Sequence, residues 1–352
     1  MGINWKELFP TKLSVFIFIC YMSLFVNQGI LVTASQEKNN SYNYNTVTVV
    51  LFTEIVKLIV SVVLYCKDES FTSLLKSVKK DAKVLLLYFV PAFLYCLYNN
   101  LAFTNLSTFD PTTYYLLLQF RVVITGILFQ IIFKKYLSKR QWFSLILLTV
   151  GCMLKQFHFG NEAEMTKSGI GEKNMTGFDF SISAAFIFIQ TICSCLAGVY
   201  NEYLLKDKGA EVNIYVQNVF MYLDSILCNS VILLLKGELF EAFKAENLSS
   251  VFRYYVVIII INNAAIGIIT SFFLKYMNSI LKTFASALEL VFTAIFAYIL
   301  FTIPIYINTV LAIGVVSFSI YLYSQNPVVN LGKVAAKHED SEKLLSGDAE
   351  EV

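Results

Sequence analysis

Long apolar stretches recur along nearly the whole of this 352-residue sequence, with short polar segments between them. A helix needs roughly 20 consecutive apolar residues to cross a bilayer, and hydrophobic residues make up 57% of the chain. A soluble domain of this length would be less apolar. Because lipid offers no partner to an open backbone, each crossing segment must be helical. The sequence therefore predicts an all-α polytopic membrane protein that is embedded in the lipid bilayer.

Hydropathy divides the chain into ten candidate transmembrane helices. The first apolar segment is too long for the core of a signal peptide and lacks a convincing cleavage site. The last two helices are separated only by residues 302–304, where Pro304 fits the start of a helix. The expected spans are 13–34, 46–66, 84–105, 112–133, 140–157, 181–205, 213–235, 253–274, 280–301 and 303–325.

The distribution of lysine and arginine predicts the orientation of these helices. With the N-terminus in the cytosol, the tails and the cytosolic loops hold eighteen of these residues and the opposite loops hold six. Positively charged loops stay on the cytosolic side, so both termini are expected there. The glycosylation sequons, which are used on the lumenal side, fall in the opposite loops in this scheme. They begin at Asn39, Asn105, Asn174 and Asn247, and the use of Asn105 is doubtful so close to the membrane.

An internal repeat indicates how the helices are organised. Residues 123–133 align without a gap on residues 291–301, with five of eleven positions identical. One copy lies in the fourth expected helix and the other in the ninth, which implies two five-helix halves of opposite orientation. Such inverted repeats are typical of transporters, which bind their substrate between the halves. The expected units are a first half at 1–157, a lumenal loop at 158–180, a second half at 181–325 and a disordered cytosolic tail at 326–352.

Arg121 is the feature of the apolar segments that most needs an explanation. It lies inside residues 112–133, which hold no other charge. A cation near the middle of a membrane helix costs about 2.5–3.5 kcal/mol on the mildest scale. We therefore expect Arg121 to face an interior cavity where an anion offsets that cost.

Other polar side chains in the expected spans leave a functional and a structural interpretation open. Amides such as Asn262 and Asn263 also join membrane helices to one another without binding a ligand. Glu54 and Lys57 are three residues apart and most simply form an ion pair. Lys155 is close enough to a helix end to reach the interface. Two acidic residues could be counterions rather than ligands: these are Asp224 and Glu289.

Several classes of function are poorly supported by the sequence. The seven cysteines all lie in or at the ends of expected spans, which gives no disulfide framework, and Cys193 and Cys195 have the wrong spacing for a zinc or redox motif. The two histidines lie in a loop and in the tail, so no catalytic or metal-binding constellation can be assembled in the membrane. We expect neither an enzyme nor a bound metal or cofactor, and nothing indicates a nucleic-acid partner.

The whole chain resembles the nucleotide-sugar transporters of the Golgi, in the branch that carries CMP-sialic acid, UDP-galactose and UDP-N-acetylglucosamine. This family has a ten-helix inverted-repeat fold of the drug/metabolite transporter superfamily. The stretches that carry the resemblance are PAFLYCLYNNLAF from Pro91, YYLLLQFRVV from Tyr114, FKKYLSKRQW from Phe133, CLAGVYNEYLLKDKG from Cys195 and FLKYMNSILKTFASALE from Phe273.

The resemblance also implies a set of substrate-binding residues, comprising tyrosines, amides, a close-approach glycine and cations. Tyrosine rings can stack on a base, amides can read its edge, and Arg or Lys can hold phosphate. The branch usually has lysine where this chain has Arg121, which keeps the charge and gains a bidentate fork. The residues carried over are Tyr95, Asn99, Tyr114, Arg121, Gly198, Asn218, Ser271 and Lys282.

The implied function is antiport in the Golgi membrane, with UDP-galactose entering the lumen and UMP leaving by alternating access. Another nucleotide sugar, such as UDP-N-acetylglucosamine or CMP-sialic acid, and an unrelated metabolite remain alternatives. A membrane receptor that transports nothing is the rival from another class. A homodimer and an association with glycosyltransferases are both left open by the sequence.

Overall fold

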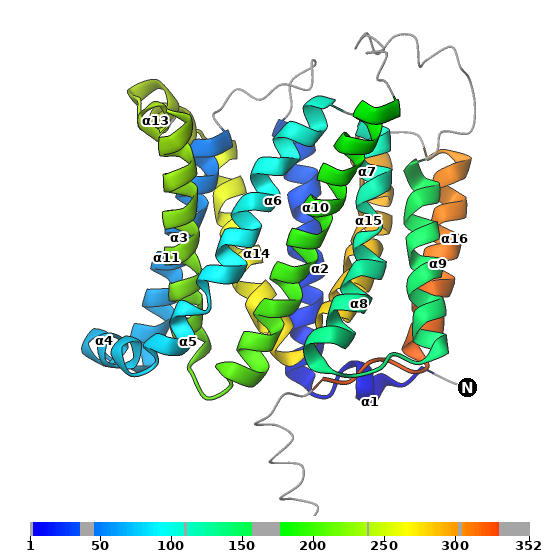
Figure 1. Cartoon of the computed structure of the whole chain (residues 1–352), viewed down its shortest axis with the longest axis horizontal. Helices are drawn as coiled ribbons and strands as arrows, with labels where there is room; N and C mark the ends of the chain where they lie inside the picture. The colour runs from blue at the N-terminus through cyan, green and yellow to red at the C-terminus, as the bar shows by residue number, and fades with distance from the viewer. Residues whose placement is uncertain are drawn as a thin grey trace, which may run out of the picture.

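The computed structural model describes residues 3–35, 46–108, 111–156, 177–237, 239–301 and 305–330, and all its elements in these ranges are helical. The long helices stand side by side in one bundle (Figure 1). They are α2 (Lys12–Ser35), α3 (Thr46–Asp68), α6 (Phe89–Thr108), α8 (Arg121–Phe133), α9 (Lys139–Gln156), α10 (Gly177–Tyr203), α11 (Ile214–Lys236), α14 (Tyr254–Tyr276), α15 (Ser279–Phe301) and α16 (Ile307–Ser324). The shorter helices are α1 (Trp5–Leu8), α4 (Phe71–Lys80), α5 (Ala82–Leu86), α7 (Pro111–Leu118), α12 (Leu239–Ala242), α13 (Ala245–Val251) and the π-helix η2 (Leu204–Lys208).

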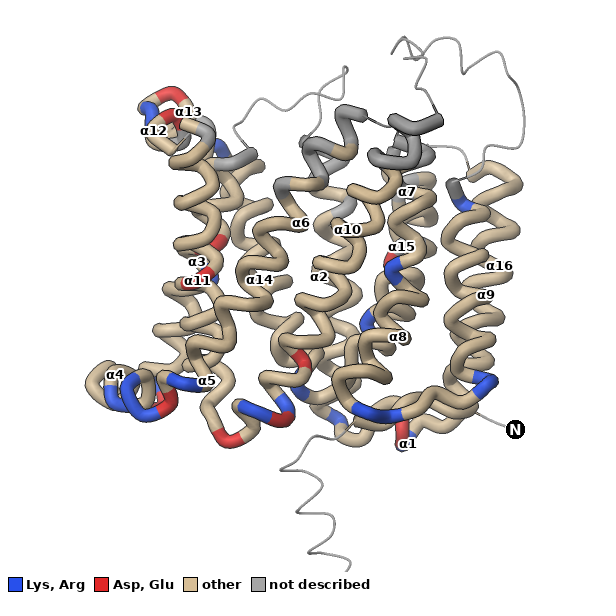
Figure 2. The backbone as a smooth tube through the Cα atoms, viewed as in Figure 1, with Lys and Arg blue, Asp and Glu red and all other residues tan. Residues whose placement is uncertain are grey.

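Eight segments of the described chain are long and apolar enough to cross a membrane. The surface of the bundle is apolar, with Phe16, Ile131 and Leu235 among its exposed side chains, while Gln190 and Gln217 are fully buried. An apolar exterior around buried polar groups is the pattern expected of a protein that lipid surrounds. The charged residues gather at the two ends of the bundle, with few along its middle (Figure 2).

Two expected helices are interrupted. The segment 112–133 divides into α7 and α8, because the amides of Gln119 and Phe120 bond to carbonyls three residues back, at 3.1 and 3.2 Å, and tighten the turn. A second break, at Leu87, separates α5 from α6. Pro91 explains it, since proline has no N–H to donate to the carbonyl four residues earlier.

Helices that precede residue 157 pack mainly on helices that follow residue 177. Thus α2 packs on α14 and α15, α3 on α11 and α14, and α6 on α10 and α11. In the same way α8 packs on α10 and α15, and α9 packs on α16. The two parts of the chain therefore share one interface that runs through the bundle.

One end of the bundle carries α1, α4, η2 and residues 325–330 (Figure 1), and we call it the terminal end. Amphipathic α4 lies against it, with Leu74 buried beside Tyr65 and Leu85. Lysines occupy the last turn of α4. Helices α12 and α13 lie at the opposite end (Figure 1).

Two of the sequons lie in the described residues. Asn105 was expected in a loop, but it lies inside α6, is 2% exposed, and donates its amide to the Gln190 side chain at 2.7 Å. The expectation for Asn105 was therefore wrong, because the helix continues to Thr108. Asn247 lies in α13, whereas Asn39 and Asn174 are outside the described residues.

Candidate functional site

Arg121 is the first residue of α8, directly after the break in the fourth expected span. Its carbonyl accepts hydrogen bonds from the Thr125 hydroxyl at 2.7 Å and the Cys195 thiol at 3.3 Å. Its guanidinium makes no hydrogen bond or ion pair with any residue that the structure describes. The backbone is thus held by α8 and α10, and the charged group is left for another partner.

One cationic and one anionic side chain of α15 face Arg121. Lys282 and Glu289 are seven residues apart, which places them on one face of α15. Both side chains are partly buried, and both interact electrostatically with the Arg121 guanidinium. Glu289 also interacts with Lys155 of α9. Arg121 therefore lies between a cation and an anion of the neighbouring helix.

Two predicted residues, Tyr95 and Gly198, meet between α6 and α10. Tyr95 of α6 directs its hydroxyl toward Gly198 of α10, and a methyl group added at Gly198 would lie 3.7 Å from that oxygen. An alanine fits at this distance, whereas a larger side chain would meet the tyrosine ring. Glycine at this position keeps space open beside Tyr95.

Tyr21 of α2 belongs to the same group, and the sequence analysis missed it. The side chain is fully buried, and its polar neighbours are Ser286, Glu289, Arg121 and Tyr95. Of these neighbours, Ser286 is the one whose hydroxyl lies near enough to the Tyr21 hydroxyl for a hydrogen-bonding interaction. The only signal in the sequence is a tyrosine inside an apolar span, which helix packing explains equally well.

Ser271 of α14 lies in a second polar group with Tyr222 of α11 and Glu54 of α3. Asn218 is four residues before Tyr222, on the same face of α11. Asn218 is 2% exposed and its amide nitrogen has no hydrogen-bond partner among the described residues. Ser271 donates to the Gly267 carbonyl at 3.5 Å and interacts with the Tyr222 hydroxyl. No hydrogen bond, ion pair or ring contact between described residues joins this group to Arg121.

The predicted Glu54–Lys57 pair is part of this second group. Their charged atoms are 2.5 Å apart, and both side chains are 13% exposed, so the expected pairing is confirmed. The Lys57 ammonium also lies 4.9 Å from the centre of the Tyr222 ring. Gly267 leaves room for the Lys57 side chain, since a methyl group there would overlap the Lys57 stem.

The remaining predicted residues lie toward the end that carries α12 and α13. Tyr114 of α7 is 4% exposed, and its hydroxyl accepts a hydrogen bond from Gln190 at 2.8 Å. Gln190 is also bound by Asn105, so Tyr114 belongs to a network that joins α6, α7 and α10. Asn99 of α6 is exposed. The break between α7 and α8 separates Tyr114 from Arg121.

This arrangement can bind an anion with aromatic and amide groups attached. A guanidinium and an ammonium on facing helices suit a phosphate, to which arginine can donate a bidentate pair of hydrogen bonds. Buried tyrosines and the free Asn218 amide can hold a ring and its polar edge. The helical bundle and this cationic site suit a membrane protein that binds an anionic organic solute.

Comparisons with known proteins identify the family. A model of the nucleotide-sugar transporter family matches residues 12–324, and the chain belongs to that family. The UDP-galactose transporter senju of Drosophila melanogaster is 66% identical, covering 100% of this chain and 98% of its own. CMP-sialic acid transporter 2 of Arabidopsis thaliana is 31% identical over 91% of this chain and 79% of its own. One solved crystal structure matches with a TM-score of 0.61 at 12% identity, over 89% of this chain and 96% of that one, a likeness of fold alone.

Proposed function

We propose that this transporter exchanges UDP-galactose for UMP across the Golgi membrane. The substrate follows from the Drosophila relative, which shares two thirds of its residues with this chain along their whole length. The observation that carries the proposal is the Arg121 guanidinium, which lies inside an apolar bundle and makes no hydrogen bond or ion pair with any described residue, although the Glu289 carboxylate lies near enough to interact with it electrostatically. A diphosphate supplies the missing anion, and Lys282 on the facing helix supplies a second contact for it.

The charges around Arg121 favour exchange over a one-way carrier. Without nucleotide, Glu289 is the nearest source of negative charge, and Lys282 and Lys155 leave the site positive in sum. Moving that charge through the middle of the membrane is unfavourable. A bound nucleotide neutralises the site, so the loaded protein reorients faster than the empty one. In this proposal Glu289 is a counterion of Arg121 and Lys155 and does not bind the substrate.

The packing pattern supports ten crossing helices in two inverted halves. The ten are the eight apolar segments together with α2 and α9. If the ten helices are numbered in chain order, a twofold symmetry of the two halves exchanges each helix with the one five places away, such as α2 with α10. The α2–α14 contact then becomes the α10–α6 contact, and the α8–α10 contact becomes the α15–α2 contact. The α3–α11, α8–α15 and α9–α16 contacts map onto themselves. A pseudo-twofold axis between the halves accounts for this pattern, and alternating access is a rocking of such halves.

The charge distribution supports a cytosolic position for the terminal end, where α4 carries its lysines. Asn247, at the other end, then lies in the lumen where glycosylation occurs. Protease protection of tags on the two termini, in sealed Golgi vesicles, tests this orientation. Tags that resist the protease until detergent is added would overturn it.

A panel of radiolabelled nucleotide sugars tests the substrate. Purified protein in proteoliposomes loaded with UMP should accumulate UDP-galactose well above UDP-N-acetylglucosamine and CMP-sialic acid. Preferential uptake of CMP-sialic acid by vesicles loaded with CMP would instead make the protein a CMP-sialic acid transporter. Uptake of none of them would favour an unrelated metabolite or a receptor.

A further inference from the structure

A buried ion pair lies at the terminal end, apart from the residues that we assign to the substrate. Glu202, near the end of α10, and Lys206, in η2, are 3.1 Å apart, and their side chains are 0% and 2% exposed. The π-helical turn after α10 places Lys206 here, and such turns are frequent at functional sites. The proposed mechanism makes no use of either residue.

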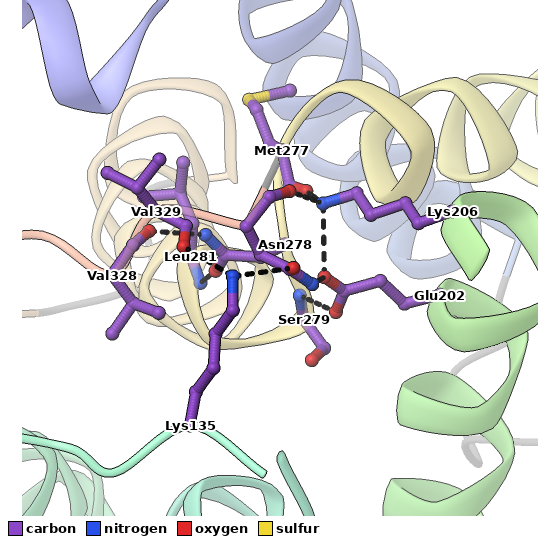
Figure 3. Close-up of polar contacts among 10 residues, drawn as sticks. Lys135, Glu202, Lys206, Met277, Asn278, Ser279, Leu281, Val328 and Val329 are labelled. Atoms are coloured by element: carbon purple, nitrogen blue, oxygen red, sulfur yellow. Dashed lines mark hydrogen bonds and ion pairs between the residues drawn. The ribbon is translucent and has the colours of Figure 1, made fainter. Parts of the chain in front are cut away.

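This pair holds the start of α15. One oxygen of Glu202 accepts a hydrogen bond from the Ser279 amide at 2.7 Å, and Lys206 donates to the Met277 carbonyl (Figure 3). Ser279 is the first residue of α15, and Lys282 lies in the same turn. The Glu202 carboxylate also lies at the positive end of the α15 helix dipole. The position of the α15 cation therefore depends on Glu202.

The pair also binds the segment that follows α16. Residues 326–330, which we call the strap, run from α16 across the terminal end toward α10 (Figure 1). Asn330 donates its amide to Glu202 at 2.7 Å, and its carbonyl accepts from Lys206 at 2.5 Å. Lys135, in the turn between α8 and α9, donates to the Asn330 side chain at 3.2 Å. One network thus joins α10, α15, the strap and the α8–α9 turn.

Two further bonds fix the strap along its length. The Asn278 amide donates to the Val328 carbonyl at 2.8 Å, and Gln141 of α9 donates to the Asn326 carbonyl at 3.0 Å. Val328 and Asn330 are each 8% exposed. The strap therefore seals the helix ends beneath Arg121 and Lys282 rather than hanging free.

We propose that the Glu202–Lys206 pair and the strap form the cytosolic gate, that this structure holds the gate closed, and that Glu202 is the residue that positions α15. The inference rests on the proposed transport function and orientation. Ions suit such a gate, because a buried ion pair gains little net free energy over the same ions in water. Opening to the cytosol hydrates both charges, so the closed and open states remain near in free energy. An apolar plug of similar size would favour closure strongly.

Chemical labelling of Cys195 tests the gate without requiring transport. Cys195 is buried beside Arg121, so a thiol reagent reaches it only through an open gate. The other six cysteines are replaced by serine, and sealed vesicles with the cytosolic face outward receive a membrane-impermeant maleimide. Glu202→Gln, or truncation after Gln325 to remove the strap, should raise the labelling rate about tenfold, equivalent to about 1.4 kcal/mol.

Truncation after Asn330 is the matched control, because it removes residues 331–352 and leaves the strap intact. Its labelling rate should equal that of the full chain, and UMP added outside should slow labelling in the open variants. If neither Glu202→Gln nor removal of the strap changes the labelling rate, the network only holds the helix ends together and the proposal of a gate is wrong. Truncation leaves Glu202 in place, so it decides the matter even if Glu202→Gln fails to fold. If the variants are labelled faster but the wild-type protein takes up no UDP-galactose, the proposed gate is supported and the proposed substrate is wrong.

Discussion

Replacing Arg121 with alanine should reduce UDP-galactose uptake by about tenfold or more. A charge-assisted hydrogen bond to phosphate is worth about 1.5–3 kcal/mol, and 1.4 kcal/mol is a factor of ten. Lys282, on the facing helix, remains near the phosphate, but its ammonium cannot reproduce the bidentate geometry of the lost group. Initial uptake rates in proteoliposomes, normalised to folded protein, measure this effect.

Three variants separate a phosphate contact from a structural role for Arg121. Arg121→Lys keeps the charge and should retain much of the activity. Glu289→Gln removes the internal competitor for Arg121, so it should lower the KM for UDP-galactose. Asp224→Asn, which alters a carboxylate on α11, should leave that KM unchanged.

Uridine lacks phosphate, so the affinity for uridine should not change in Arg121→Ala. Wild-type uptake by folded Arg121→Ala would make the arginine structural.

Replacing Lys57 with methionine should destabilise the protein by about 3–5 kcal/mol. The change leaves the Glu54 carboxylate buried without its partner, and removal of one member of a buried pair has a cost of that size. It also removes the cation from the face of the Tyr222 ring. The melting temperature and the monodisperse fraction of the detergent-solubilised protein report the change.

The double variant Glu54→Gln/Lys57→Met should recover most of that stability, because no uncompensated charge remains. The exposed pair of Glu241 and Lys244 is the matched control, with its charged atoms 2.9 Å apart and its side chains 57% and 61% exposed. Lys244→Met should change stability by only about 0–1 kcal/mol. Equal losses from Lys57→Met and Lys244→Met would mean that burial of the first pair contributes nothing.

Hydropathy predicted the helices well because the membrane imposes their length and their apolar surface. The expected span 213–235, for example, differs by a single residue at each end from α11. Hydropathy is blind to hydrogen-bond pattern, so it passed over the break at Gln119 and the π-helical turn at Lys206. Both changes leave the apolar composition of their segments unaltered.

The candidate site was predictable in its charges and less so in its partners. Arg121 was evident because a lone cation in an apolar span is costly. Tyr21 was not, because a tyrosine in such a span is also ordinary packing. The strap lies within the stretch for which composition predicted disorder, yet Pro327, Val328 and Asn330 are buried. The backbone carbonyls of Asn326 and Val328 accept hydrogen bonds from the rest of the bundle. A backbone carbonyl leaves no mark in the sequence, so such contacts require the structure.

Exchange is the central claim, and preloaded proteoliposomes test it most directly. Vesicles loaded with UMP, with GMP or with buffer alone receive radiolabelled UDP-galactose outside, and the initial rates of entry are compared. The charges around Arg121 predict rapid entry with internal UMP and much slower entry into the empty vesicles, and the proposed preference for uridine nucleotides predicts slow entry into the GMP-loaded vesicles as well. Equal rates in all three preparations would contradict the account and make the protein a uniporter or a channel.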